Sequence, residues 1–157
     1  MHYRYQPSPL GPLLLAGDLQ GLHLVHMDAA HPWELPQSWQ LAGNQLDAVA
    51  RQLDEYFSGT REAFELTLAP LGTPFQQEVW QALQRIPYGT TCSYRDLAEH
   101  IGRPRAVRAV GTANGANPIA IIVPCHRVIG SNGTLTGYAG GVERKQMLLE
   151  LEGAWLI

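Results

Sequence analysis

A cysteine and a histidine stand side by side in the segment Pro124-Cys125-His126-Arg127. A thiol is a poor nucleophile until it loses its proton, and a neighbouring imidazole or positive charge favours that loss. The apolar run 119–123 leads into the segment, and a rigid proline stands directly before the thiol. These residue types in this order indicate a reactive cysteine rather than one that is only packed.

Size and composition set the class of protein. The 157 residues fit one domain of ordinary size or two small ones. A hydrophobic share of 45% and a charged share of 16% are typical of a folded globular protein. The first ten residues do not resemble a signal peptide, and no apolar stretch approaches the about 18 residues that a membrane span needs. Two cysteines make no disulfide framework. We therefore expect a cytoplasmic protein with no membrane partner.

Basic residues are concentrated in the second part of the chain. Residues 1–72 carry three arginines against eight acidic residues, whereas residues 73–157 carry eight basic and six acidic ones. This asymmetry hints at contact with a polyanion, but ordinary surface charge is the simpler explanation. Charge alone therefore leaves the partner open.

The first part of the chain reads as short strands separated by turns. The expected strands are 3–6, 13–16, 22–26 and 63–68. A helix is expected over 44–57, because apolar residues recur there at three- and four-residue spacing. Residues 69–72, Ala-Pro-Leu-Gly, form the expected linker. We therefore place an N-terminal α/β domain at 1–68 and a second domain at 73–157.

Helix signals dominate after the linker. Thr73-Pro74-Phe75-Gln76 is a capping box with proline at the first helical position, and Ser93 begins a second N-cap signature. The expected helices run over 74–85, 94–101, 105–114 and 142–152. The two middle helices are joined by a tight turn containing glycine and proline, as in a helix-turn-helix.

The helix expected over 105–114 is built mainly from small residues. Gly111 in its interior costs about 1 kcal/mol relative to alanine, so it requires an explanation. Close helix packing is one explanation. Close approach to a DNA minor groove, with Arg105 and Arg108 reaching beyond the small side chains, is another. An arginine flanked by small residues would also fill the gap left by an extruded base.

Five segments together resemble one protein family. They are Thr91-Cys92-Ser93-Tyr94, residues 105–111, Asn117-Pro118, residues 122–128 and residues 137–141. In order and spacing they are similar to the O6-alkylguanine-DNA alkyltransferases, also called methylated-DNA–protein-cysteine methyltransferases. The resemblance covers 73–157 densely and 1–68 only loosely. It implies an α+β protein: a small, ribonuclease H-like N-terminal domain with an antiparallel sheet and a helix, and a mostly helical, winged helix-turn-helix C-terminal domain.

The resemblance also implies a reaction. The alkyl group of O6-alkylguanine, and of O4-alkylthymine, would pass irreversibly to Cys125 after the base is flipped from the minor groove, once per molecule. His126 would take the thiol proton through a water, and Glu152 would hold His126 in the right tautomer. Tyr94 would help the backbone rotate and would donate a proton to guanine N3. Asn117 would brace the cysteine loop.

Further residues acquire binding roles from the same resemblance. The expected substrate-binding residues are Val128, Tyr138, Ala139 and Gly140. Arg108 would replace the flipped base, and the other expected DNA-binding residues are Arg105, Ala106, Ala109, Gly111, Thr112 and Arg127. The expected partner is double-stranded DNA containing alkylated guanine, bound by a monomer, with cooperative binding along DNA left open.

Two departures from the family pattern matter. Ala139 stands where many members have serine, so a side-chain hydroxyl near O6 is missing. Some members bind zinc in the N-terminal domain, but no cysteine precedes Cys92 and the histidines there are irregularly spaced. We therefore expect no metal and no cofactor. Cys92 itself fits a small buried residue at a helix start, and a disulfide between it and Cys125 would block the chemistry.

Two other classes of function compete with alkyl transfer. The helix-turn-helix would also suit a non-catalytic DNA-binding regulator or lesion sensor, but neither needs Cys125, His126 and Glu152. Cys125 and His126 would also suit a thiol hydrolase. Hydrolases, however, usually bring their histidine from a distant segment, because adjacent side chains rarely point at each other.

Overall fold

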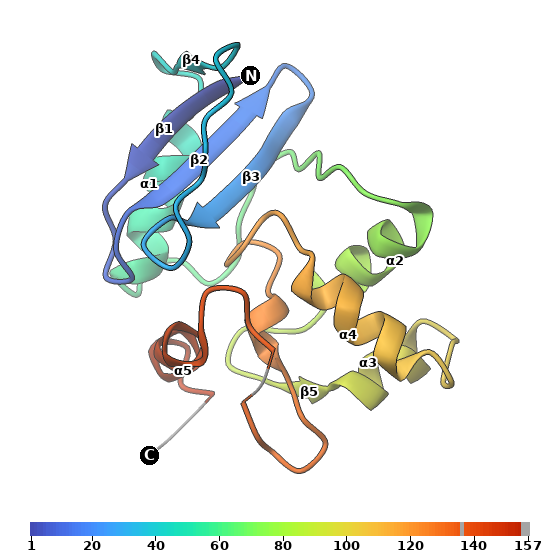
Figure 1. The fold of residues 1–157 in the computed structure, drawn as a ribbon. Helices are drawn as coiled ribbons and strands as arrows, with labels where there is room; N and C mark the ends of the chain where they lie inside the picture. The colour runs from blue at the N-terminus through green and yellow to red at the C-terminus, as the bar shows by residue number, and fades with distance from the viewer. Residues whose placement is uncertain (136, 155–157) are drawn as a thin grey trace.

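The computed structural model describes residues 1–135 and 137–154. Its N-terminal part is a sheet backed by one helix (Figure 1). The strands are β1 (His2–Gln6), β2 (Leu13–Asp18), β3 (Gly21–Met27) and β4 (Gln40–Leu41), in the order β3-β2-β1-β4. The pairs β1–β2 and β2–β3 are antiparallel, whereas β4 joins β1 in parallel. The predicted antiparallel sheet is thus confirmed, with an unpredicted parallel edge.

Both faces of this sheet are covered, so β2 is buried along most of its length. Helix α1 (Asp47–Phe57) packs on one face through Val49, Leu53 and Tyr56. Residues of the segment before β4, among them Leu35 and Trp39, pack on the other face. The helix begins three residues later than predicted, because residues 44–47 form a turn in which the Asp47 amide donates to the Asn44 carbonyl.

The strand predicted over 63–68 is wrong. Only Leu68 makes a single parallel bridge, to Leu22 at the start of β3. The free edge of β3 is divided between two segments, because Val25, further along, pairs with Ile119 from the second part of the chain. Residues 63–66 therefore have no strand edge left to join.

The second part of the chain is mostly helical. It contains α2 (Pro74–Leu83), α3 (Tyr94–His100), α4 (Val107–Gly115) and α5 (Val142–Leu151). Between them lie the short strands β5 (Cys92–Ser93) and β6 (Val128–Ile129), which pair in parallel, and the 3-10 turn η1 (Cys125–Arg127). Helices α2, α3 and α4 pack against one another, and α5 packs on η1 (Figure 1).

Helix ends in this part are mostly where the sequence predicts them. The capping boxes at Thr73 and Ser93 are both formed. Helix α4 begins two residues later than predicted, because the Ala106 amide closes a turn onto the Arg103 carbonyl. Helix α2 ends two residues early, as the amides of Arg85 and Ile86 bond three residues back.

The capping box at Thr73 gives a stability prediction. The Thr73 hydroxyl accepts from the Gln76 amide at 3.1 Å, and the Gln76 side chain accepts from the Thr73 amide at 2.9 Å. Thr73→Ala is expected to lower the free energy of unfolding by about 1 kcal/mol, measured by urea denaturation. The same change at exposed Thr67 serves as the control, and an equal loss in both variants would contradict the capping contribution.

Candidate active site

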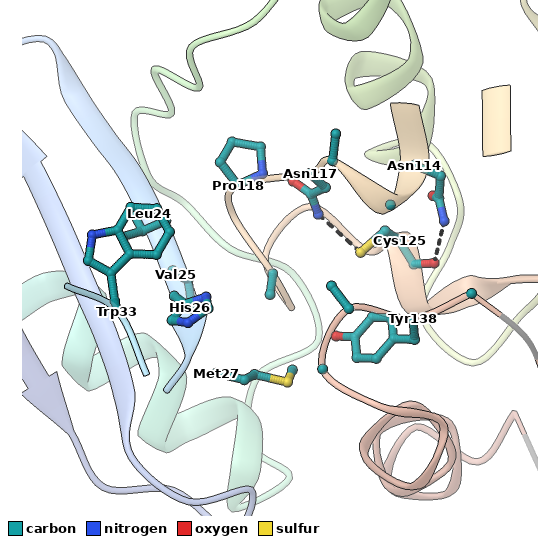
Figure 2. Close-up of a pocket in the computed structure, with 16 residues that line it drawn as sticks. Leu24, Val25, His26, Met27, Trp33, Asn114, Asn117, Pro118, Cys125 and Tyr138 are labelled. Atoms are coloured by element: carbon teal, nitrogen blue, oxygen red, sulfur yellow. Dashed lines mark hydrogen bonds between the residues drawn. The ribbon is translucent and has the colours of Figure 1, made fainter. Parts of the chain in front are cut away.

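A cavity of about 220 Å³ lies where the sheet meets the second part of the chain (Figure 2). Cys125 opens into it from η1, and Tyr138, Ala139 and Gly140 line another wall. The C-terminal end of α4 and residues 24–27 of β3 complete the enclosure. Three of the four expected substrate residues therefore share one cavity with the expected nucleophile. Val128 is fully buried and does not line this cavity.

Asn117 holds the loop that carries Cys125. Its Nδ2 donates to the Val123 carbonyl at 2.8 Å and to the Cys125 sulfur at 3.2 Å, and its Oδ1 accepts from the Ile119 amide at 3.0 Å. One side chain thus contacts both the nucleophilic atom and the backbone before it. The bracing expected of Asn117 is consistent with this geometry.

The same loop contains an unusual backbone conformation. Ile121 has φ of 73°, a left-handed value that is unfavourable for a β-branched residue. Neighbouring bonds hold it in place: the Val25 amide donates to the Pro118 carbonyl at 3.0 Å, and the Ala120 amide donates to the Val25 carbonyl at 3.1 Å. The approach to Cys125 is therefore fixed by β3, in the other part of the chain.

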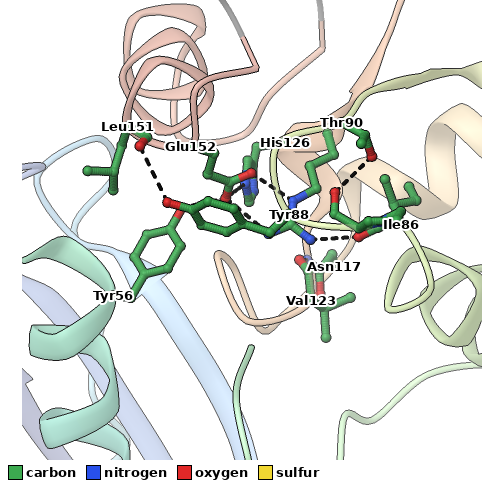
Figure 3. A network of polar contacts seen from close by, with 11 residues as sticks. Tyr56, Ile86, Tyr88, Thr90, Asn117, Val123, His126, Leu151 and Glu152 are labelled. Atoms are coloured by element: carbon green, nitrogen blue, oxygen red, sulfur yellow. Dashed lines mark hydrogen bonds and ion pairs between the residues drawn. The ribbon is translucent and has the colours of Figure 1, made fainter. Parts of the chain in front are cut away.

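His126 is completely buried behind the cavity and bonds to Glu152 (Figure 3). The distance from His126 Nε2 to Glu152 Oε2 is 2.7 Å. An ionised carboxylate can only accept, so Nε2 must carry the proton and Nδ1 must carry the lone pair. Among the described residues, Nδ1 has no hydrogen-bond partner. The ring is thus held in the tautomer that can accept a proton at Nδ1.

Burial is the largest influence on the pKa values of Cys125, His126 and Glu152. It raises the pKa of the Cys125 thiol, while Asn117 and the positive charge of Lys145 act in the opposite direction. Burial also lowers the pKa of His126, so its imidazole is neutral despite Glu152. Burial opposes ionisation of Glu152, but His126 and Arg127 outweigh it and lower its pKa to about 2. The thiol is therefore protonated before reaction, and a neutral base stands next to it in the sequence.

The contacts of Arg127 disfavour the DNA-binding role that the resemblance implied. Its Nε and Nη2 donate to the two oxygens of Glu152 at 2.8 and 3.1 Å, and its Nη1 donates to the Ile86 carbonyl at 2.7 Å. The guanidinium also lies over the Tyr88 ring, 5.7 Å from its centroid. With these contacts and 7% exposure, it has no free face for a phosphate.

The other expected DNA residues lie on the exposed side of α4 and in the two residues before it. Arg105, Arg108, Ala109 and Thr112 are exposed, and Ala106 and Gly111 are partly exposed. A Cβ on Gly111 would meet only the Tyr94 ring, at 3.7 Å, which is ordinary contact. Close helix packing therefore does not require a glycine here. Of the two explanations for Gly111, close approach of the helix to an external surface such as a DNA groove remains.

Two models of one protein family match nearly the whole chain. Residues 74–154 match the DNA binding domain of 6-O-methylguanine DNA methyltransferase, and residues 1–70 match its ribonuclease-like domain. The chain belongs to this methyltransferase family. The resemblance drawn from the five segments and the predicted α+β fold class are both confirmed.

Individual relatives are similar from end to end. A methylated-DNA–protein-cysteine methyltransferase of Methanosarcina acetivorans is 53% identical over 98% of this chain and 99% of its own length. One of Mycobacterium tuberculosis is 51% identical over 97% of this chain and 92% of its own. The crystal structure of M. tuberculosis OGT in complex with DNA superposes with a TM-score of 0.91 at 50% identity, covering 98% and 94% of the two chains.

Three residues of this methyltransferase-family site were missed from the sequence. Lys145, the only lysine of the chain, is fully buried, and its Nζ donates to the Val128 carbonyl at 2.5 Å. Asn114 donates to the Cys125 carbonyl at 3.4 Å, and Tyr56 bonds to Glu152. A single lysine near the end of the chain is a signal that could have been read. Tyr56, by contrast, looks like any aromatic residue on a helix.

The second cysteine, Cys92, does not line the cavity at Cys125. Both cysteines are free, and burial, helped by Asp96, raises the pKa of the half-buried Cys92 thiol to about 11. Within residues 1–135 and 137–154, no group of His, Cys, Asp and Glu side chains could hold a metal ion. Over the same residues, no helix has the length and apolar character needed to cross a membrane.

Proposed function

We propose that this chain is a DNA repair protein that moves the alkyl group from O6 of guanine, and from O4 of thymine, onto its own Cys125. Its family membership supports this, as does the name methylated-DNA–protein-cysteine methyltransferase carried by relatives about half identical to it. The observation that carries the proposal is the position of the Cys125 thiol, at a cavity backed by the His126–Glu152 pair.

The transfer step follows from the protonation states. The proton leaves Cys125 for His126 Nδ1 through a water, and Glu152 stabilises the imidazolium. The thiolate then attacks the alkyl carbon, so an S–C bond forms as the C–O6 bond breaks. The departing guanine takes a proton at N3 from Tyr94. Because a thioether is a stable product, Cys125 is consumed in one turnover.

Access to the lesion requires the base to leave the helix stack. We propose that α4 enters the minor groove with its small residues Ala109, Gly111 and Thr112, and that Arg108 occupies the place of the flipped base. Tyr138, Ala139 and Gly140 would then contact the extruded guanine in the cavity, the Ala139 amide donating to O6. A contact through the Val128 carbonyl stays a prediction, since this residue lies outside the cavity wall.

Several expectations remain predictions. They are the domain limits 1–68 and 73–157, the monomeric state, a cytoplasmic location, binding without a metal or cofactor, and any cooperativity on DNA.

One experiment tests the proposed function directly. The protein is incubated with a duplex oligonucleotide containing one O6-methylguanine, and the masses of the intact protein and of its peptides are measured. We expect one methyl group on the Cys125 peptide, with Cys92→Ala reacting normally and Cys125→Ala not at all. A lesion bound tightly without any methylated peptide would instead indicate a lesion sensor.

Arg108 gives a prediction specific to base flipping. Arg108→Ala is expected to slow transfer from duplex DNA by about tenfold to a hundredfold, because unstacking a base costs a few kcal/mol. Transfer from free O6-benzylguanine, which needs no flipping, should be unchanged. Arg51→Ala on α1 removes the same charge from an exposed helix position and serves as the control. Equal loss on both substrates would contradict the role in flipping.

A further inference from the structure

Tyr56 links the N-terminal part of the chain to the proton-accepting pair (Figure 3). It lies on α1, is completely buried, and its hydroxyl donates to Glu152 Oε2 at 2.5 Å. The two residues are 96 positions apart in the sequence. Glu152 Oε2 is the same oxygen that accepts from His126 Nε2. A helix of the N-terminal part therefore reaches the atom that orients the base.

The direction of this hydrogen bond is fixed by chemistry. Burial and the charge of Glu152 raise the pKa of Tyr56 far above its usual value, so the phenol keeps its proton. An ionised carboxylate has no proton to give, so Tyr56 must be the donor. Glu152 Oε2 thus accepts from His126, Tyr56 and Arg127 Nη2 together.

Resting on the proposed function, we propose that Tyr56 is a positioning residue of alkyl transfer, which fixes the Glu152 carboxylate against His126 and limits how basic His126 becomes. A donor to Oε2 withdraws negative charge from the oxygen that faces the imidazole. Less charge there means weaker stabilisation of the imidazolium. The N-terminal part of the chain therefore sets the proton affinity of the base as well as supporting the site.

Other groups also act on this pair, and they remain in place when the Tyr56 hydroxyl is removed. Arg127 faces both Glu152 and His126, and Lys145 acts on His126 from α5. Tyr88 lies beside Arg127, and its hydroxyl donates to the Leu151 carbonyl at 3.4 Å rather than to Glu152. Tyr88 therefore offers a matched control: the same chemical change beside the same network, without the bond to the carboxylate.

A purely structural role must be separated from this one, because the N-terminal part braces the site at other places. Met27 packs so closely on Gly140 that a Cβ there would lie 2.4 Å from its sulfur. The Leu10 carbonyl accepts from Arg144 Nε on α5 at 3.0 Å. Loss of any such contact would lower the amount of active protein. It would not shift the proton affinity of His126.

The test compares Tyr56→Phe with Tyr88→Phe and the unaltered protein. Single-turnover methyl transfer from the O6-methylguanine duplex is measured from about pH 5 to about pH 9. For Tyr56→Phe we expect a rate about threefold to tenfold lower near neutral pH and an acidic limb displaced to higher pH. Tyr88→Phe should follow the unaltered protein. Superimposable profiles for all three proteins would overturn the proposal, as would a lower rate with an undisplaced limb.

A second readout needs no alkyl transfer. Titration of the His126 ring, followed by NMR in the unreacted protein, should give a higher pKa in Tyr56→Phe than in Tyr88→Phe. An unchanged His126 titration would overturn the positioning role even if methyl transfer itself is confirmed. Conversely, absence of methyl transfer in the unaltered protein would defeat the proposed function, with the titration still deciding the role of Tyr56.

A variant that strengthens the donor covers the case in which Tyr56→Phe does not fold. Replacement of Tyr56 by 3-fluorotyrosine keeps the ring and the hydroxyl but makes the phenol a stronger donor. The acidic limb and the His126 pKa should then move to lower values, opposite to the phenylalanine variant. Movement in the same direction as Tyr56→Phe, or none, would contradict the proposal.

Discussion

Glu152→Gln is expected to slow alkyl transfer by about 10²- to 10⁴-fold, the contribution of a positioned general base. Glutamine has the shape of glutamate, so packing is retained. Its amide cannot satisfy the site, however, because His126 Nε2 and Arg127 both donate to the native carboxylate. If the amide oxygen faces His126, its NH₂ group meets the donors of Arg127. In the opposite orientation, the NH₂ group faces the Nε2 proton of His126, and the imidazole loses the acceptor that fixes its tautomer.

The same change should destabilise the fold. Arg127 is buried, and removing the charge of its partner leaves an uncompensated cation, at a cost of about 3–5 kcal/mol. The Glu152 pKa of about 2 lies below its ordinary 4.5, so its contribution to stability is complete above 4.5 and is lost as pH falls through 2. Glu152→Gln should therefore weaken the acid dependence of the unfolding free energy in that window.

Two measurements and one control decide this prediction. Single-turnover transfer gives the rate, and urea unfolding at neutral and acidic pH gives the stability. Glu150→Gln alters an exposed glutamate of the same helix and should change neither. A Glu152→Gln protein that transfers methyl at the unaltered rate would remove the Glu152 carboxylate from the proposed mechanism.

Local signals account for what the sequence predicted well. A capping box is completed within four residues, so the starts of α2 and α3 could be read directly. Asn117 likewise bonds within its own loop. Such features depend on neighbours in the chain, whereas the bonds from Val25 of β3 that fix the approach to Cys125 do not.

Contacts between distant segments account for what was missed. The division of the β3 edge between Leu68 and Ile119 cannot be deduced from the composition of either segment. The DNA-binding role that the resemblance implied for Arg127 is disfavoured for the same reason, since its ion pair with Glu152 joins residues 25 positions apart. The bond from Tyr56 to Glu152 joins α1 to the residue that follows α5, and no sequence pattern connects the two.

Lys145→Met is expected to slow transfer by about tenfold to a hundredfold at neutral pH without destabilising the protein. The positive charge of Lys145 favours the Cys125 thiolate, and its Nζ holds the Val128 carbonyl beside η1. Without that charge, burial of the thiol is opposed mainly by the hydrogen bond from Asn117, and less thiolate forms at a given pH. The pH dependence of transfer should therefore move to higher pH. The magnitude is that of removing one electrostatic contact from a buried reacting centre.

Although Lys145→Met should transfer methyl more slowly, its free energy of unfolding should not fall. Burial lowers the Lys145 pKa from 10.5 to about 8, so keeping this ammonium charged costs the folded state free energy below pH 8. Methionine fills a similar volume without a charge, and replacing a buried charge by an apolar group is often neutral or stabilising. Unfolding in urea at pH about 7 should thus show equal or greater stability, allowing about 1 kcal/mol for the lost hydrogen bond to Val128. A variant that is both slower and clearly less stable would mean that Lys145 supports the fold. Slower transfer in an equally stable protein would assign the only lysine of the chain to the chemistry of Cys125.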